Sequence, residues 1–306
     1  DRSGQSISAF LQPGNYAEAG LSVLDPDVQG KDNAGNKVSD MGEDYYFPAA
    51  AIKIQATDQI SLGLLYDQPF GADSQYAPES NAFATVNTNK GTLEGTSVEV
   101  KTNSITALIG YQPNANWNVY AGPVYQTVKA KVSLRGTAYK GPQVLGGYDI
   151  DIKEGEAYGW LAGFAYSIPE IALKAAVTYR SEIKHEVETF ETFGLGKLIF
   201  PSSTTEVTTP QSVNLDLQSG IAKNTLAFAN IRWVHWSQFA VTPNVLKEKS
   251  KNNLIDYSDD QWSATVGLGH KFNAKWSGTA AVGWDSGAGN PVTTLGPIEG
   301  YWSVGL

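Results

Sequence analysis

The chain has 306 residues, no cysteine and one methionine, and 22 Lys and Arg against 31 Asp and Glu give a formal net charge of −9. The lack of cysteine excludes a disulfide scaffold and any site built on cysteine. The negative charge argues against a nucleic-acid surface, because phosphate binding needs clustered Lys and Arg. No stretch approaches ~18 uninterrupted apolar residues, which excludes a transmembrane helix. With 31 Gly, 15 Tyr and 8 Trp, the composition favours either a large soluble β protein or an outer-membrane barrel.

Apolar and polar residues alternate along most of the chain, which is the pattern of strands with one apolar and one polar face. From 262 to 271, for example, Trp, Ala, Val, Leu and His alternate with Ser, Thr, Gly, Gly and Lys. The period-two rule predicts about twelve strands, at 19–24, 48–55, 60–67, 104–112, 117–131, 158–167, 171–180, 212–218, 225–236, 262–271, 276–285 and 302–306.

The faces and connections of these segments favour a membrane barrel over a soluble β-sandwich. The polar face is rich in Gly, Ser, Thr and Ala, and the apolar face often begins or ends in Trp or Tyr, as at a membrane interface. Short connections alternate with long ones, as in outer-membrane barrels. The short ones are 57–59, 113–116, 169–170, 222–224 and 273–275, and the long ones are 25–43, 68–95, 136–153, 189–209, 240–259 and 286–299.

The sequence therefore predicts an all-β fold, a transmembrane antiparallel β-barrel over residues 15–306 in the outer membrane of a Gram-negative bacterium. Residues 1–14 are predicted to be a lead-in segment on the periplasmic or luminal side. The chain starts without Met or a signal segment and stops within an alternating stretch. We therefore expect a piece of a longer chain, truncated before the last strands. About twelve strands enclose more than side chains alone fill, so the lumen is expected to hold water, a ligand or a plug.

Several segments resemble the FadL family of outer-membrane transporters for long-chain fatty acids and other hydrophobic compounds. In chain order they are LDPDV (24–28), PFG (69–71), TYRSEIK (178–184), WSQF (236–239) and YWS (301–303). The resemblance implies about fourteen strands and a passive, monomeric channel without a cofactor. Its partners would be outer-membrane lipid and a hydrophobic small molecule, a fatty acid or an aromatic hydrocarbon. Family members carry an N-terminal hatch with an Asn-Pro-Ala stretch, and no such stretch precedes Asn15.

Charged and amide side chains on three strands share the parity that points inward. A Lys or Arg facing lipid near mid-bilayer costs about 2–4 kcal/mol, so these residues are expected to face the lumen. They form either an ion-pair network that fixes the shape of the barrel or a luminal path with a carboxylate site. The residues are Lys174, Arg180, Glu182, Asp216, Asn230 and Arg232, with Asn214 beside them.

Pro69, Phe70 and Gly71 follow the predicted strand 60–67. Proline withholds a donor from the ladder and glycine tolerates unusual dihedral angles, so strand pairing is expected to fail here. The alternative is an ordinary strand end. In the family that the chain resembles, the third strand bends inward at this motif and opens the wall toward the bilayer. The resemblance therefore implies a lateral opening through which ligand leaves.

The outer loops contain the candidate capture groove. Exposed apolar surface usually marks a binding site, although loop-on-loop packing is the alternative. The resemblance places the groove between loops 136–153 and 189–209. A carboxylate also needs a cation, and Arg can grip one through two parallel hydrogen bonds, whereas loop lysines are often merely solvated. The candidates are Arg135, Tyr139, Phe193, Leu195, Leu198, Phe200, Phe239 and Lys247, with Lys249 and Lys251 nearby.

Catalysis is not predicted. The three histidines, His185, His235 and His270, lie on strands that do not bring them together, and no HExxH, GxSxG or Walker motif is present. We therefore expect neither a metal nor a cofactor. Two alternatives to uptake stay open, namely a general diffusion porin with a wider lumen lined by charge rings and a passive surface receptor or adhesin that uses the long loops.

Overall fold

The computed structural model describes residues 2–141, 145–289, 295–296 and 299–306. Twelve strands follow one another along an antiparallel sheet, which confirms the predicted fold class. They are β1 (Tyr16–Leu24), β4 (Tyr45–Gln55), β5 (Ile60–Asp67), β9 (Ser97–Tyr111), β10 (Trp117–Arg135), β11 (Gly147–Ile168), β12 (Leu173–Arg180), β16 (Ser212–Ala222), β17 (Thr225–Val234), β20 (Gln261–Lys271), β21 (Ser277–Asp285) and β22 (Tyr301–Gly305).

The other elements belong to the connections. They are β2 (Gly30–Lys31), β3 (Lys37–Val38), β6 (Gly71–Gln75), β7 (Ala84–Asn87), β8 (Thr92–Gly95), β13 (Ile183–Phe193), β14 (Leu198–Ile199), β15 (Ser203–Thr209), β18 (Ala240–Val241), α1 (Asn244–Ser250), β19 (Ile255–Asp256) and three 3-10 turns at Thr137–Tyr139, Pro169–Ile171 and Trp236–Gln238. No helix in the described ranges is long and apolar enough to cross a membrane.

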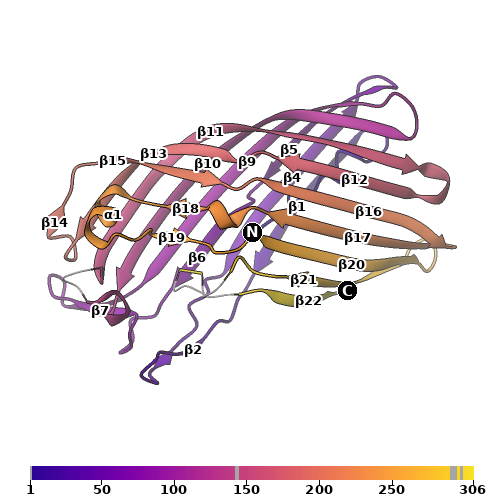
Figure 1. The fold of residues 1–306 in the computed structure, drawn as a ribbon. Coiled ribbons are helices and arrows are strands. Elements are labelled where there is room, and N and C mark those ends of the chain that lie inside the picture. The colour runs from indigo at the N-terminus through magenta and orange to yellow at the C-terminus, as the bar shows by residue number, and fades with distance from the viewer. Residues whose placement is uncertain (1, 142–144, 290–294, 297–298) are drawn as a thin grey trace.

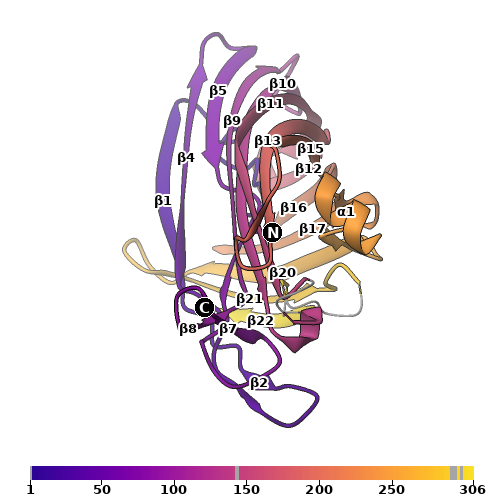
Figure 2. The ribbon, with the colours of Figure 1, turned by 90° about the vertical axis from the view of Figure 1, so that its left-hand side faces the viewer.

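The twelve strands lie side by side, and the sheet curves around an interior that contains the N-terminal end of the chain (Figures 1 and 2). Short turns join the strands at one end, whereas α1, β7 and β14 gather at the other, where the long connections lie (Figure 1). Among the described strands, β1 pairs only with β4 and β22 only with β21, so these two strands form the edges of the sheet.

Neighbouring residues of one strand lie in different surroundings, because side chains alternate between the two faces of a sheet. On β11, Trp160 is 53% exposed on the outer face and Leu161 is fully buried on the inner face. Trp117, Trp262 and Trp276 are further exposed aromatic residues on or beside the strands. An apolar, aromatic outer face is what a barrel wall presents to lipid.

The predicted outer loops contain more strand than expected. The predicted loops 136–153 and 189–209 include the first part of β11 and most of a hairpin formed by β13 and β15. β13 also pairs with the first part of β11, which extends the sheet on this side beyond the end of β12. Ile183, His185 and Val187 are buried and alternate with exposed residues, so the period-two pattern continues here. Residues 142–144, 290–294 and 297–298 of the predicted connections lie outside the described residues.

Residues 2–14, which we call the luminal segment, run through the interior of the curved sheet. Ile7 and Phe10 are fully buried, in a cluster that also contains Leu108 and Tyr120. The ring of Phe10 lies against Gly63 of β5 and Gly110 of β9, where an added Cβ would be 2.6 and 2.9 Å from ring carbons. Two wall glycines thus make room for one aromatic ring of the luminal segment.

Candidate functional site

The hydrogen bonding of the wall is interrupted between β5 and β6. β5 ends at Asp67 and β6 begins at Gly71, and both strands pair with β9. Residues 68–70 do not continue the ladder, and the amide of Phe70 donates instead to Oγ1 of Thr102 (3.0 Å). Pro69 has no amide hydrogen to contribute. We call this interruption the wall break; it lies where the PFG motif predicted that strand pairing fails.

On the side of the wall break opposite to β9, β4 also lacks a partner from β5. It pairs with β5 only from Ala50 to Gln55. Arg2 of the luminal segment lies here, with its amide donating to the carbonyl of Pro69 (2.8 Å) and its guanidinium carbon 4.1 Å from the ring centre of Tyr45. An added Cβ on Gly71 would be 2.6 Å from Cζ of Arg2. The luminal segment therefore lies directly against the wall break.

A cavity of about 390 Å³ lies beside the wall break, between the luminal segment and the wall. Pockets for small molecules typically start at about this size. Its lining combines charged and apolar groups, including Arg2, Asp67, Arg180, Leu65, Phe70, Val124 and Ile183.

Two members of the predicted luminal network, Lys174 and Arg232, hold the luminal segment in place together with Asn214. Nζ of Lys174 donates to the carbonyl of Leu11 (2.9 Å), and Nη2 of Arg232 donates to Oε1 of Gln5 (2.7 Å). Asn214 donates to the carbonyl of Gly4 (2.9 Å). On the neighbouring strand pair, Asn230 donates to Asp216. These contacts suit a network that positions the segment as well as shaping the wall.

Two members of the predicted network behave differently. Glu182 lies exposed in the connection after β12, not in the lumen, because the strand ends at Arg180 and its alternation does not extend further. Arg180 faces inward and is 7% exposed. Its Nη1 is buried without a hydrogen-bond partner among the described residues.

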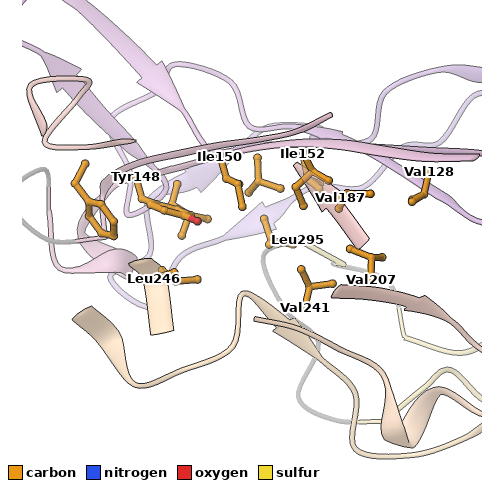
Figure 3. Packing of buried hydrophobic residues seen from close by; sticks show 13 residues of the cluster. Val128, Tyr148, Ile150, Ile152, Val187, Val207, Val241, Leu246 and Leu295 are labelled. Carbon is orange, nitrogen blue, oxygen red and sulfur yellow. The ribbon is translucent and has the colours of Figure 1, made fainter. Parts of the chain in front are cut away.

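A second apolar region, the outer cluster, lies below the outer connections. Figure 3 shows Tyr148, Ile150 and Ile152 of β11 opposite Val241 and Leu246 of the 240–259 connection. The buried members are Val98, Val128, Val132, Leu134, Tyr148, Ile150, Ile152, Val187, Phe193, Val207, Val241, Leu246 and Leu295. The cluster therefore combines the upper wall with three of the long connections.

Four of the predicted groove residues meet at the outer cluster. Phe193 is a buried member, and Tyr139, Phe200 and Phe239 are partly buried against it. Nζ of Lys249 lies 5.7 and 5.2 Å from the ring centres of Phe193 and Phe200. At such distances an ammonium group interacts favourably with an aromatic ring. This cation was among the lysines that the sequence offered.

The remaining groove candidates lie elsewhere. Leu198 is 54% exposed, and Leu195 lines a separate outer cavity together with Arg135. Lys247 is exposed on α1, with its Nζ donating to the carbonyl of Lys251 (3.2 Å). These three side chains do not contribute to the outer cluster.

Arg135 is surrounded by acceptors of the protein itself. Its Nη2 donates to both carboxylate oxygens of Asp149 (2.9 and 3.0 Å), and its Nε donates to Glu94 (3.1 Å). Nη1 donates to the carbonyls of Leu134 and Tyr148. With its guanidinium engaged in this way, Arg135 is better suited to holding the outer connections together than to binding a further carboxylate.

Glu191 is a functional candidate that sequence reasoning missed. It is 2% exposed. Its carboxylate accepts hydrogen bonds from the hydroxyl of Tyr148 (2.8 Å) and from the amides of Val245 and Leu246 (both 3.0 Å). These are amides of the first turn of α1, which have no partner within a helix. The sequence signal is the parity of the alternation, because Glu191 shares the parity of Phe193, whereas Glu186 and Glu188 have the opposite one.

The PFG and WSQF motifs meet in space. The rings of Phe70 and Trp236 pack edge to face with centres 5.4 Å apart, and Trp236 packs in the same way on Phe239 (5.0 Å). Because Phe239 also packs on the outer cluster, these three rings form an aromatic bridge from that cluster to the wall break.

Asp260 holds the WSQF motif in place. Its carboxylate accepts hydrogen bonds from Nε1 of Trp233 (2.9 Å) and the amide of Ser237 (3.1 Å) and lies 3.0 Å from Nδ1 of His235. Burial raises the pKa of Asp260, but hydrogen bonds from Ser237, His235 and Trp233 outweigh it and lower that pKa to about 2. The carboxylate therefore stays ionised and keeps its donors near neutral pH.

The histidines do not form a catalytic or metal-binding group. His185 contacts Gln126, His235 contacts Asp260 and His270 contacts Thr225, on different strands. Within the described part of the chain, no group of His, Asp and Glu is arranged to hold a metal ion.

The curved antiparallel sheet, its aromatic outer face and its polar, partly filled interior define an outer-membrane β-barrel of the channel class. Residues 7–294 match the family described as outer membrane protein transport protein (OMPP1/FadL/TodX), and the chain belongs to this family. The match confirms the family that the motifs suggested, the outer-membrane location and the transport class. This family is one of transport proteins.

Solved structures of similar fold include a FadL homologue and two toluene transporters. A FadL homologue of Pseudomonas aeruginosa is 17% identical, with 94% of this chain and 74% of that chain covered and a TM-score of 0.63. The toluene transporter TodX of Pseudomonas putida is 16% identical over 97% of this chain and 80% of that chain, with a TM-score of 0.65. The toluene transporter TbuX of Ralstonia pickettii is 16% identical over 91% and 78%, with a TM-score of 0.62. Among curated protein sequences, none matches this chain.

Proposed function

We propose that this protein is a passive channel for a hydrophobic small molecule, a long-chain fatty acid or a similar compound, which enters from the outside and leaves sideways through the wall. The observation that carries the proposal is the wall break between β5 and β6 beside a cavity of about 390 Å³. A molecule in that cavity lies beside residues 68–70, which pair with neither β4 nor β9 in a strand ladder.

Capture takes place at the outer cluster in this proposal. Leu246 and Val241 come from a connection, whereas Ile150 and Ile152 come from the wall (Figure 3). An apolar ligand that separates these two sides exchanges one apolar contact for another, so little free energy of burial is lost. Lys249 at the Phe193 and Phe200 rings then supplies a cation for a polar head group.

The aromatic bridge gives the ligand a route inward. Phe70 belongs both to the bridge and to the lining of the cavity, so a shift of Trp236 acts directly on the wall break. Release then requires the luminal segment to withdraw Arg2 from its place against Tyr45 and Gly71. No energy source is needed, because consumption inside the cell maintains the concentration gradient.

The nature of the relatives supports an apolar cargo. TodX and TbuX are named as toluene transporters, so an aromatic hydrocarbon is a cargo class beside fatty acids. The alternative of a general diffusion porin requires an open, water-filled lumen. The luminal segment, bonded to the wall through Lys174, Asn214 and Arg232, argues against it.

Gly71→Leu tests lateral release. The leucine side chain would occupy the space of the Arg2 guanidinium and fill the wall break. We expect uptake of radiolabelled dodecanoate by cells that produce the full-length protein to fall at least about tenfold, the effect of about 1.4 kcal/mol on the release barrier.

The matched control is Gly269→Leu, on β20. An added Cβ there has its nearest neighbours at 4.0 Å, so a side chain has room and uptake should match that of the wild type. Normal uptake by a Gly71→Leu protein that reaches the outer membrane in normal amount would rule out an exit at this place.

A further inference from the structure

The lipid-facing side of β9, β10 and β11 changes in character toward the outer end of the wall. These strands run side by side toward the end of the sheet where β7 lies (Figure 1). Tyr125 and Tyr158 are paired across β10 and β11, with ring centres 5.5 Å apart. Aromatic residues on the outer face of a barrel mark the membrane interface. Residues of the same parity further along β10 therefore lie at or above the lipid head groups.

A row of lysines follows above these tyrosines. Lys129 lies four residues beyond Tyr125 on β10, about 13 Å at about 3.3 Å per residue. It is directly opposite Lys101 of β9, and the shift in register between β10 and β11 places it opposite Lys153 and Glu154. All four charged side chains of this row are on exposed residues. Three lysines against one acid give the row a net positive charge.

The lysine row has no carboxylate that balances Lys129. Lys101 pairs with Glu99 (3.0 Å) and Lys153 with Asp151 (2.8 Å), whereas no ion pair reaches Lys129 among the described residues. Like charges directly opposite each other destabilise a strand pair. An anion between Lys101 and Lys129 would remove that repulsion, and long lysine side chains can reach along the wall toward it.

The next row outward is different, because its charges alternate. Lys131 is opposite Glu99 on β9 and Asp151 on β11. This lysine therefore has an acid on either side and needs no further anion. The contrast between Lys129 and Lys131, two residues apart on one strand, restricts the anion position to the lower row.

A polar cavity of about 670 Å³ lies above both rows. Its floor consists of four polar residues that are paired in register across β6, β9, β10 and β11, namely Gln75, Ser97, Ser133 and Asp149. Their neighbours Val98, Val132 and Ile150 are buried in the outer cluster. Since successive side chains point to opposite faces of a sheet, the cavity lies on the outer face of the wall.

The sides of this cavity are also polar. Asn87 and Glu94 come from the β7–β8 hairpin. Arg135, bonded to Glu94 and Asp149, holds that hairpin against the wall. Hydroxyl, amide and carboxylate groups are donors and acceptors that suit the hydroxyl groups of sugars.

We propose that the outer face of β9, β10 and β11 binds a phosphorylated glycolipid of the outer leaflet. From the membrane outward this face presents aromatic rings, the lysine row and the polar cavity. A phosphorylated glycolipid presents acyl chains, phosphates and sugars in the same order. Its phosphate lies between Lys101 and Lys129, and its sugars extend into the cavity. The proposal goes beyond uptake, because it concerns the outer face of the wall and does not depend on what passes through the lumen.

Binding of lipid A, a phosphorylated glycolipid, tests the proposal. Native mass spectrometry of the full-length protein in detergent measures the Kd for diphosphorylated lipid A and for its dephosphorylated form. We expect Lys129→Gln to raise the Kd for the diphosphorylated form about tenfold, which is about 1.4 kcal/mol, and to leave the Kd for the dephosphorylated form unchanged. The matched control is Lys131→Gln, which removes an exposed lysine with acids on both sides and should leave both Kd values near those of the wild type.

The alternatives give different results. If the wild type binds the two forms of lipid A equally tightly, or if Lys129→Gln binds the diphosphorylated form as the wild type does, the phosphate position is wrong. Phosphatidylglycerol, which has a phosphate but no sugar, is the third probe. Binding of this lipid as tightly as diphosphorylated lipid A would overturn the assignment of the polar cavity to sugars. None of these readings measures uptake, so failure here leaves the channel proposal to its own test.

Discussion

Replacing Phe10 by alanine will open the lumen to ions and small solutes. The ring is fully buried, packs edge to face on Tyr120 with centres 5.7 Å apart, and lies where Gly63 and Gly110 leave space for it. Removing a buried phenylalanine typically costs about 3–5 kcal/mol. The hydrogen bonds that remain between the luminal segment and the wall contribute only about 0.5–1.5 kcal/mol each when neutral. The segment should therefore leave its place in a large fraction of molecules.

Single-channel recording in planar bilayers measures this effect. We expect Phe10→Ala to give frequent, long-lived conductance steps where the wild type is nearly silent. Ser8→Ala is the matched control, because Ser8 lies on the same segment with an exposed side chain. If Phe10→Ala is as silent as the wild type while its barrel is folded, another group holds the segment and the packing argument fails.

The wall was predictable from the sequence because its signal is local. Every second residue of a membrane strand faces lipid, so Trp160 and Leu161 differ in surroundings for a reason that needs no knowledge of the partner strand. The same rule, carried on beyond Arg180, would have found β13, where Ile183 and Val187 are buried. It was missed because Ser181 and Glu182, which belong to neither strand, separate it from β12 and shift the alternation by one residue.

The interior was not predictable in the same way. Nothing near Phe10 indicates that Gly63 and Gly110, on two other strands, leave space for its ring. The sequence predicted a position on the periplasmic or luminal side for residues 1–14, but without the family's Asn-Pro-Ala stretch before Asn15 it did not mark them as a plug. Such packing depends on pairs of residues that are distant along the chain.

The candidate site shows the same difference between local sequence signals and contacts of residues that are distant along the chain. The PFG motif predicted a failure of strand pairing, because Pro69 lacks a donor wherever it is placed. By contrast, the sequence predicts Arg135 as a carboxylate anchor, but in the structure its guanidinium already pairs with Glu94 and Asp149. The contact of Phe70 with Trp236 joins two motifs from opposite halves of the chain. Residue types show which interactions a side chain can make, but the fold determines which of these interactions are already made within the protein.

The largest effect on capture is expected from Glu191→Ala. The carboxylate fixes α1 through the amides of Val245 and Leu246, and α1 in turn supplies Leu246 to the outer cluster. Alanine leaves these donors and the Tyr148 hydroxyl without an acceptor. Hydrogen bonds to a charged group contribute about 1.5–3 kcal/mol each. A net loss of about 3 kcal/mol raises the open fraction of the connection on the order of 100-fold.

Hydrogen exchange followed by mass spectrometry measures that opening in the peptide that contains α1. We expect its protection to fall about 100-fold and the outer cluster to bind dodecanoate more weakly, because one side of the cluster is no longer held. Glu188→Ala removes an exposed acid from the same strand and should change neither quantity. Glu191→Gln keeps an acceptor without the charge, so its exchange protection and its dodecanoate affinity should lie between those of Glu191→Ala and Glu188→Ala. Unchanged exchange in Glu191→Ala would mean that apolar packing of Leu246 alone holds the connection, and capture would then not depend on this carboxylate.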